Sequence, residues 1–348
     1  QLTTETRTMT GETPVTFGYR YDCLGRLRSK EYPMGVTVRY RYDNYGNRVG
    51  SEIDGRCVRL LTTDDGQNTV AEYGGTIRGG EPGIVHVNRL KSISFPNLSV
   101  ENPLMTHTAT YNDQGLLTGF SLKRSLGATT LRSMTFSFDG ATGNLLSRKG
   151  MTSQKEKFEY DDLDRLVRVR RGLTAAQEID YAANGNIESK TEVGTLCYDG
   201  SRPHAVTAAG NTSGYIPSTT QQVTYTPFGK VAKLTEGSCT MTFTYGPDGQ
   251  RWRTVLKENG ATRRKTFYAG DYERVTEDGT TRHIFYLDDG CVYIMEDGQT
   301  TGTYYCAFTD HLGSVTRLYD DTGHAAFVAE YDAWGKQDVT TNTIGFRR

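Results

Sequence analysis

One short motif recurs along the chain, and its spacing limits what the chain can fold into. Most copies start with an aromatic residue, followed by Asp or a small polar residue, two variable residues and Gly, and the copy at Tyr160 has Asp164 in the position of Gly. Arg, Lys or Asn often comes next. The distance from Tyr21 to Tyr42 is 21 residues, and the distance from Tyr160 to Tyr181 is again 21. A period of about 21 residues is too short for a βαβ unit but fits two short strands with their connections.

The motif has the chemistry of a tight turn between two strands. Asp can accept hydrogen bonds from the backbone of the turn that follows it, and Gly three positions later suits a backbone with positive φ. The flanks alternate, so that Val36, Val38 and Tyr40 share one face of a predicted strand. The residues that we predict to form this structural set are Tyr21, Asp22, Gly25, Arg26, Tyr42, Asp43, Gly46, Tyr160, Asp161, Tyr225, Gly229, Tyr245, Gly249, Asp310, His311, Gly313, Tyr331, Asp332 and Gly335.

The polarity of the strands predicts how they assemble. The apolar face is often Tyr, which keeps a polar tip, and the opposite face carries Arg, Thr, Lys and Glu. This pattern favours an all-β fold with a large single-layer sheet of hairpins that is wet on both faces. Such a sheet must close, coil or be capped, because open edges aggregate.

Composition excludes several classes of function. The chain has 348 residues with a net charge of −1, which argues against coating nucleic acid or docking on an anionic membrane. No apolar run is long enough to span a membrane as a helix. The chain starts with Gln and shows no signal peptide, so we expect it to be a segment of a larger protein.

The cysteines and histidines do not form a recognisable metal or cofactor motif. The six cysteines show no CxxC spacing, which favours isolated thiols, although sequence alone leaves disulfide pairing open. They are Cys23, Cys57, Cys197, Cys239, Cys291 and Cys306. The six histidines are dispersed as well. We therefore predict no catalytic, cofactor-binding or metal-binding residue.

Two features still suggest chemistry as alternatives. His311 follows Asp310, which could form an acid–base pair, but a turn capped by Asp310 explains the same residues. Paired carboxylates could serve a glycosidase or bind a cation, yet they occupy turn positions where Asp is expected anyway. These pairs are Asp64–Asp65, Asp161–Asp162, Asp288–Asp289 and Asp320–Asp321.

At these motifs the chain resembles the RHS/YD-repeat family. The resemblance rests on the iterated Tyr-Asp-x-x-Gly-Arg unit, on the segment Arg202–Val206, and on Asp310–Arg317 followed by Tyr331–Gly335. It implies hairpins coiled into a hollow β-shell over residues 1–300, with degenerate stretches near 51–110 and 200–222. Residues 301–348 resemble the start of the RHS repeat-associated core. The self-cleaving part of that core would lie beyond Arg348, so we expect this segment neither to cleave itself nor to be toxic.

The resemblance implies a non-enzymatic shell segment that encloses and shields a C-terminal toxin or effector in a larger secreted protein. The expected partners are that toxin or effector domain of the same polypeptide and its delivery machinery, and the expected localisation is secreted or cell-surface. The alternative is a cell-surface adhesin or carbohydrate-binding protein, whose tyrosines would contact glycans. A carboxylate-based hydrolase on a β-scaffold is a third hypothesis.

Overall fold

The computed structural model describes residues 1–42, 46, 48–53, 56–60, 92–96, 103–112, 116–124, 129–150, 154–211, 220–287, 290–320 and 322–347. Among these residues strands dominate, and the only helical element is a short 3₁₀ helix, η1 (Pro33–Gly35). In this described part, no helix is long and apolar enough to cross a membrane. The predicted all-β fold is therefore confirmed. Asp43 and the pairs Asp64–Asp65 and Asp288–Asp289 lie outside the described residues, as do Asp321 and most of the predicted degenerate stretch near 51–110.

The strands fall into two groups along the chain. The first group contains β1 (Thr4–Arg7), β2 (Val15–Tyr21), β3 (Leu27–Glu31), β4 (Thr37–Tyr42), β5 (Arg48–Ile53), β6 (Arg56–Leu60), β7 (Ser92–Pro96), β8 (Pro103–Tyr111), β9 (Leu117–Arg124), β10 (Thr130–Phe138), β11 (Leu145–Lys149), β12 (Glu156–Tyr160), β13 (Leu166–Arg171), β14 (Thr174–Tyr181), β15 (Ile187–Lys190), β16 (Gly194–Cys197) and β17 (Ala208–Ala209). The second contains β18 (Gln221–Tyr225), β19 (Val231–Glu236), β20 (Cys239–Tyr245), β21 (Arg251–Glu258), β22 (Ala261–Ala269), β23 (Tyr272–Glu277), β24 (Thr280–Leu287), β25 (Cys291–Glu296), β26 (Thr303–Thr309), β27 (Val315–Asp320), β28 (Ala325–Tyr331) and β29 (Gln337–Asn342).

Within the described residues these groups form a 17-stranded and a 12-stranded sheet. Within each sheet every strand pairs antiparallel with the next strand along the chain, as β2 does with β3 and β20 with β21. The pairing register shifts at many motif aromatics, including Tyr21, Tyr160 and Tyr245. Such bulges bend the strand and increase its right-handed twist. The repeat therefore supplies a bend at regular intervals, which favours a coiled rather than a flat sheet.

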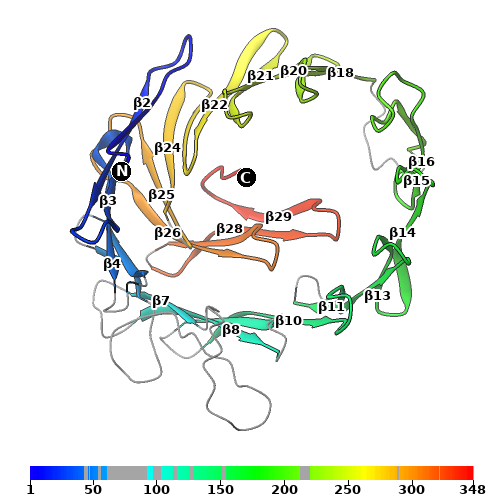
Figure 1. Ribbon diagram of the computed structural model, residues 1–348, viewed down its shortest axis with the longest axis horizontal. Helices are drawn as coiled ribbons and strands as arrows, with labels where there is room; N and C mark the ends of the chain where they lie inside the picture. The colour runs from blue at the N-terminus through cyan, green and yellow to red at the C-terminus, as the bar shows by residue number, and fades with distance from the viewer. Residues whose placement is uncertain are drawn as a thin grey trace.

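The sheet winds into a spiral (Figure 1). In this view the chain runs from β2–β4 at the left, past β7–β10 below and β13–β16 at the right, to β18–β22 above. It then passes inside its own first strands as β24–β26, and β28 and β29 lie further inward. The C-terminal end lies within the ring of strands. The predicted winding of YD-repeat hairpins into a shell is thus confirmed.

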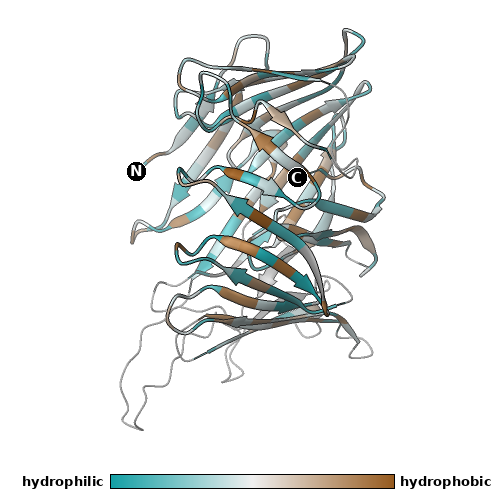
Figure 2. Cartoon of the chain, turned by 90° about the vertical axis from the view of Figure 1, so that its right-hand side faces the viewer, coloured by the Kyte–Doolittle hydropathy of each residue, from teal (hydrophilic) through white to brown (hydrophobic). Residues whose placement is uncertain are grey.

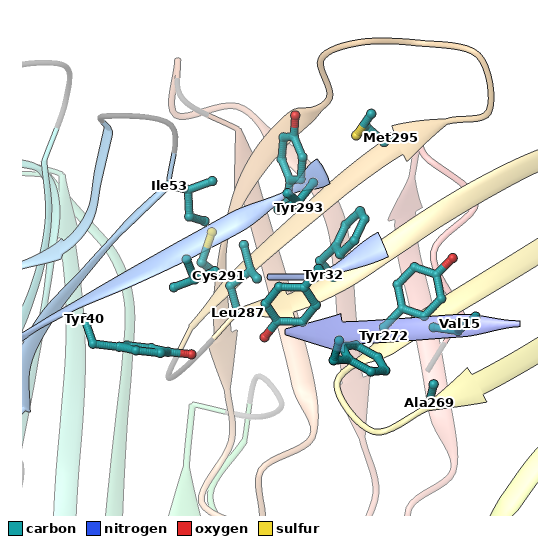
Figure 3. Close-up of a cluster of buried hydrophobic side chains, with 14 of the residues drawn as sticks. Val15, Tyr32, Tyr40, Ile53, Ala269, Tyr272, Leu287, Cys291, Tyr293 and Met295 are labelled. Atoms are coloured by element: carbon teal, nitrogen blue, oxygen red, sulfur yellow. The ribbon is translucent and has the colours of Figure 1, made fainter. Parts of the chain in front are cut away.

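Where the turns of the spiral overlap, apolar side chains fill the space between the layers. We name one such cluster the Tyr272 core. From β2, η1 and their neighbours it takes Val15, Phe17, Tyr32, Val36, Val38, Tyr40 and Ile53, and from β22–β25 it takes Phe267, Ala269, Tyr272, Phe285, Leu287, Cys291, Tyr293 and Met295. Figure 3 shows these two groups of side chains facing each other. The start of the chain is therefore held against strands some 250 residues later by buried apolar side chains.

A second cluster, the Phe327 core, lies on the other face of β24 and β25. Its members include Ile284 and Val292 from these strands, Phe327 from β28 and Phe346 near the C-terminal end. Successive residues of a strand point to opposite faces, so Ile284 packs inward while Phe285 packs outward. Strands β24 and β25 are consequently buried on both faces, in contrast to the single wet layer that the polarity predicts.

The single-layer arrangement does hold in the upper part of the spiral, at β18–β20. Among the described residues of these strands, no side chain is fully buried. Figure 2, which faces the right-hand side of Figure 1, shows hydrophobic and hydrophilic residues interspersed along the strands. The sheet itself continues across residue 300, because β25 pairs with β26. The division into residues 1–300 and 301–348 stays a prediction.

Candidate functional site: the repeat turns and the inner hairpin

The first repeat turn shows how the motif shapes the backbone. The Asp22 carboxylate oxygen Oδ1 accepts hydrogen bonds from the backbone N–H groups of Leu24 and Arg26, each at 2.9 Å. The Arg26 guanidinium Nε donates to the other oxygen, Oδ2, at 2.6 Å. Gly25 between them has φ of +80°, a conformation that L-residues with a Cβ adopt at a cost. The turn at Asp161 repeats the two amide contacts and the arginine contact.

These contacts favour the charged form of the aspartates. The hydrogen bond from the Arg26 amide is the main cause that lowers the pKa of Asp22, outweighing desolvation. For Asp161 desolvation raises the pKa, but the Arg165 amide and guanidinium outweigh it, so that the pKa is lowered overall. The turns are thus held by ionised carboxylates at neutral pH.

Five of the motif tyrosines connect their turn to the one before it. In these five the hydroxyl donates to a backbone carbonyl in or next to the preceding turn, as Tyr42 does to Leu27 O at 2.7 Å. The same contact runs from Tyr160 to Leu145, from Tyr181 to Leu166, from Tyr245 to Val231 and from Tyr331 to Val315. These hydroxyls therefore satisfy carbonyl groups of the neighbouring hairpin.

The cation of one motif also covers the tyrosine ring of the next. The Arg26 guanidinium lies 4.6 Å from the Tyr42 ring centroid, and that of Arg165 lies 4.5 Å from the Tyr181 ring. Lys230 is placed in the same way over Tyr245, at 5.3 Å. Such cation–π contacts are worth roughly 0.5–2 kcal/mol each. The order Asp, Gly, Arg and then Tyr about 16 residues later therefore describes one physical joint between hairpins.

The Arg202–Val206 segment provides this joint where two motifs lie far apart. The Arg202 guanidinium lies 4.2 Å from the Tyr225 ring. His204 Nδ1 lies 2.7 Å from Asn186 Oδ1, and Asn186 Nδ2 donates to Pro203 O at 2.8 Å. The segment is thus attached to the turn before it and covers the tyrosine after it.

The remaining motif glycines also have positive φ. The values are +89° for Gly46, +83° for Gly229, +69° for Gly249, +88° for Gly313 and +83° for Gly335. Asp164, which replaces Gly in its copy, has φ of +60°. The functional importance of these motif residues stays a prediction, and the following substitution tests it.

Replacing Gly229 by Val is expected to lower the free energy of unfolding by about 1–3 kcal/mol, because a β-branched residue is strained at positive φ. A Cβ at Gly229 would meet nothing closer than Arg202 Nη1 at 4.0 Å, so strain rather than a clash is measured. Chemical denaturation of Gly229→Val and of the control Gly229→Asn gives the difference, since Asn tolerates this conformation better. Equal stability of the wild type and Gly229→Val would refute the assignment of the turn.

Asp310 and His311 are used for packing and for a turn. Asp310 Oδ1 accepts the backbone N–H groups of Leu312 and Ser314, each at 2.9 Å. The His311 ring lies 4.8 Å from that of Phe136 in β10, centroid to centroid. Burial lowers the pKa of His311, although Asp310 acts in the opposite direction. The structure thus shows the contacts of a capped turn, the simpler of the two sequence interpretations.

Beyond the repeats, polar contacts join the inner hairpin to the wall that surrounds it. We use "inner hairpin" for β28, β29 and the turn Asp332–Lys336, and "wall" for β10–β15. Arg148 Nη2 of β11 donates to Tyr331 O at 2.9 Å, and Gln177 Nε2 of β14 donates to Asp332 Oδ2 at 3.1 Å. Arg132 of β10 forms an ion pair with Glu330 at 3.2 Å.

One of these contacts depends on a buried ion pair. Arg148 Nε lies 2.6 Å from Glu156 Oε2, and the side chains are 2% and 0% exposed. Arg171 Nε binds the other Glu156 oxygen at 3.0 Å. A buried carboxylate costs free energy unless it is paired, so Glu156 holds the two arginines in place. Arg148 in turn reaches the inner hairpin.

Between the wall and the inner hairpin lies a cleft of about 360 Å³. It is lined mainly by charged and amide side chains, among them Arg171, Gln177, Glu192, Glu330 and Lys336. In the parts of the chain that the structure describes, no three His, Cys, Asp or Glu residues come together as metal ligands. The arrangement can hold two pieces of chain together through charge and hydrogen bonds.

Sequence reasoning predicted Tyr331 and Asp332 but missed their partners. Arg148, Glu156 and Gln177 occupy ordinary strand positions. The alternation of polar and apolar residues along a strand predicts that polar side chains point to solvent. For Glu156 this prediction is wrong, because its side chain is 0% exposed. No local pattern distinguishes it from an exposed strand glutamate.

Antiparallel hairpins wound into a spiral, with joints of turn Asp, cation and Tyr between several of the repeats, define the class of YD-repeat β-shells. A family model of the teneurin YD-shell matches residues 85–344, and a model of the RHS repeat matches residues 21–56. The chain therefore belongs to the teneurin YD-shell family. The predicted relation to RHS and YD repeats is confirmed.

Solved structures share the fold. The crystal structure of TcdB2-TccC3-Cdc42 is similar over 96% of this chain and 18% of that chain, with 12% identity and a TM-score of 0.70. The structure of the Photorhabdus luminescens Tc holotoxin pore is similar over 93% of this chain and 18% of that chain, with 13% identity and a TM-score of 0.67. The crystal structure of TcdB2-TccC3 without its hypervariable C-terminal region is similar over 94% of this chain and 18% of that chain, with 14% identity and a TM-score of 0.59. The chain thus spans about 18% of the length of these relatives. No curated protein sequence matches it.

Proposed function

We propose that this chain is a non-enzymatic segment of a shell wall that encloses and shields a toxin or effector carried C-terminally in the same polypeptide. Its action is steric. A wall of paired strands keeps proteases and other macromolecules away from the enclosed segment until release. The delivery machinery of the complete protein and a secreted or cell-surface location are part of this proposal, because the matched folds come from Tc toxin assemblies.

The position of the C-terminal end carries the proposal. In Figure 1 this end lies inside the ring of strands, and Figure 2 places it near the middle of the molecule in the perpendicular view. The N-terminal end lies at the periphery in Figure 2. A polypeptide attached after residue 348 would therefore begin inside the spiral, whereas one attached before residue 1 would begin at the periphery.

The state of the motif side chains supports a structural role for the repeats. The aspartates bind turn amides, the tyrosine hydroxyls bind carbonyls, and cations cover several of the rings. The same contacts account for the tyrosine stripe without a glycan ligand, so no specific observation favours the carbohydrate-binding alternative.

Protection of a C-terminal extension tests the proposal. The same unstructured peptide with one protease site is attached either after residue 348 or before residue 1. We expect cleavage of the C-terminal copy to be slower by at least about tenfold, since proteolysis follows the population of open states.

The control for this experiment is the N-terminal copy, which should be cut at the rate of the free peptide. Cleavage after mild denaturation should become equally fast at both ends. Equal rates at both ends of the native protein would contradict the proposal of containment.

A further inference from the structure

Two of the cysteines face each other across neighbouring strands. Cys291 of β25 and Cys306 of β26 are paired in the antiparallel register, and both are thiols in the structure. The Ala307 N–H donates to Gly290 O at 2.7 Å, which makes the adjacent position a hydrogen-bonded pair. Because the two kinds of pair alternate, Cys291 and Cys306 form a non-hydrogen-bonded pair.

This kind of pair brings side chains close together. Its Cα atoms are about 4.5 Å apart, which lies within the range of about 4.4–6.8 Å that a disulfide spans. The next pair on the same face consists of Tyr293 and Tyr304, whose rings stack with centroids 4.3 Å apart. Side chains at these positions along β25 and β26 therefore do meet.

The two thiols differ in their surroundings. Cys291 is buried in the Tyr272 core, where Figure 3 shows it beside Leu287 and near Ile53 of β5. Cys306 is partly exposed. Burial raises the pKa of the Cys291 thiol, and the neighbouring Cys306 adds to this effect. Cys306 is thus the thiol that a reagent in solution reaches first.

We propose that Cys291 and Cys306 are a disulfide-forming pair, closed by thiol–disulfide exchange with a small-molecule disulfide such as glutathione disulfide. The Cys306 thiolate attacks one sulfur of that disulfide, forming a mixed disulfide and releasing one thiolate. Cys291 then loses its proton and attacks the Cys306 sulfur, which releases the second thiolate. In total, two protein thiols are oxidised, one disulfide is reduced to two thiols, and one protein S–S bond is formed.

The location gives this bond a consequence for the spiral. β25 packs against the first turn of the spiral through Cys291 and Tyr293, while β26 leads on to the inner strands β27–β29. A covalent bond between them fixes the register at the point where the chain turns inward. It closes a loop of about 16 residues, so we expect the oxidised form to have a Tm higher by about 3–6 °C.

A proteolytic map tests the pairing directly. The chain is incubated with glutathione disulfide, both as the native protein and during refolding, and remaining thiols are alkylated. Glu296 lies between the two cysteines, whereas no Lys or Arg does, so a Glu-specific protease separates them and trypsin does not. We expect two peptides, containing Cys291 and Cys306, that stay linked until a reductant is added.

Single variants separate the roles of the two thiols. Cys291→Ser should leave Cys306 as a stable mixed disulfide with glutathione, because the second attack is lost. Cys306→Ser should leave Cys291 unmodified in the native protein. The matched control is Cys239→Ser, an exposed cysteine in β20, which should leave the linked peptides unchanged. Separate alkylated peptides in the native and refolded samples, or linkage of either cysteine to a different one, would overturn the proposal.

Discussion

Replacing Arg148 by Met is expected to lower the free energy of unfolding by about 3–5 kcal/mol, because it leaves a buried carboxylate without its main partner. Glu156 is 0% exposed and lies between Arg148 and Arg171. Arg171 is 38% exposed, so water screens the charge that remains beside Glu156. The variant also loses the hydrogen bond from Arg148 to Tyr331 O.

The loss should be located at the inner hairpin as well as in the total stability. Arg148 joins β11 to β28, and the two partners of that hydrogen bond are 183 residues apart in the sequence. We therefore expect amide hydrogens of β28 and β29 to exchange faster in Arg148→Met, whereas those of β18–β21 should keep their wild-type rates. Urea denaturation and hydrogen exchange measure the two effects.

Arg168→Met is the matched control on the same wall. Arg168 also pairs with two glutamates, Glu159 and Glu178, but these side chains are 36–55% exposed. Such surface pairs contribute about 0–1 kcal/mol, so this variant should lose no more than that. A double variant with Met at positions 148 and 156 should recover part of the loss, because no charge stays buried. Equal losses in Arg148→Met and Arg168→Met would show that burial of the pair does not matter.

The local geometry of the repeat could be predicted from the sequence because it is set by neighbouring residues. Asp22, Gly25 and Arg26 make their turn contacts within five residues, and chemistry at that distance is visible in the motif. The joint to Tyr42 spans one period and appears as the constant spacing of the motifs. The positive φ of Asp164 follows in the same way from its place in the glycine slot.

The overlap between successive turns of the spiral could not be predicted from the same pattern. Alternation tells which residues share a face but not which layer covers that face. A weak signal was present in the runs Ile284–Leu287 and Cys291–Met295, where apolar residues follow one another without alternating. Continuous runs are typical of strands that are buried on both faces. The partners of Arg148 and Gln177 on the inner hairpin depend on this overlap and were not visible for the same reason.

Replacing Phe285 by Ala is expected to cost about 3–5 kcal/mol of unfolding free energy, because it creates a cavity between two layers of the spiral. Phe285 of β24 is 0% exposed. The centroid of its ring lies 5.8 Å from that of Tyr32, which belongs to the first turn of the spiral, and 5.3 Å from that of Tyr272. Guanidinium denaturation gives the loss, and hydrogen exchange should show faster opening of β2–β4 as well as of β24.

Phe243→Ala is the matched control, since Phe243 occupies the middle of β20, in the single-layer part of the spiral. Its ring is partly exposed and has the Arg251 guanidinium 5.9 Å from its centroid. The apolar area lost there predicts a cost of about 1–2 kcal/mol, with opening confined to β19–β21. If Phe243→Ala proves as costly as Phe285→Ala, strand pairing rather than layer contact stabilises the spiral. If Phe285→Ala costs more and also opens β2–β4, contact between the turns holds the first strands of the shell in place.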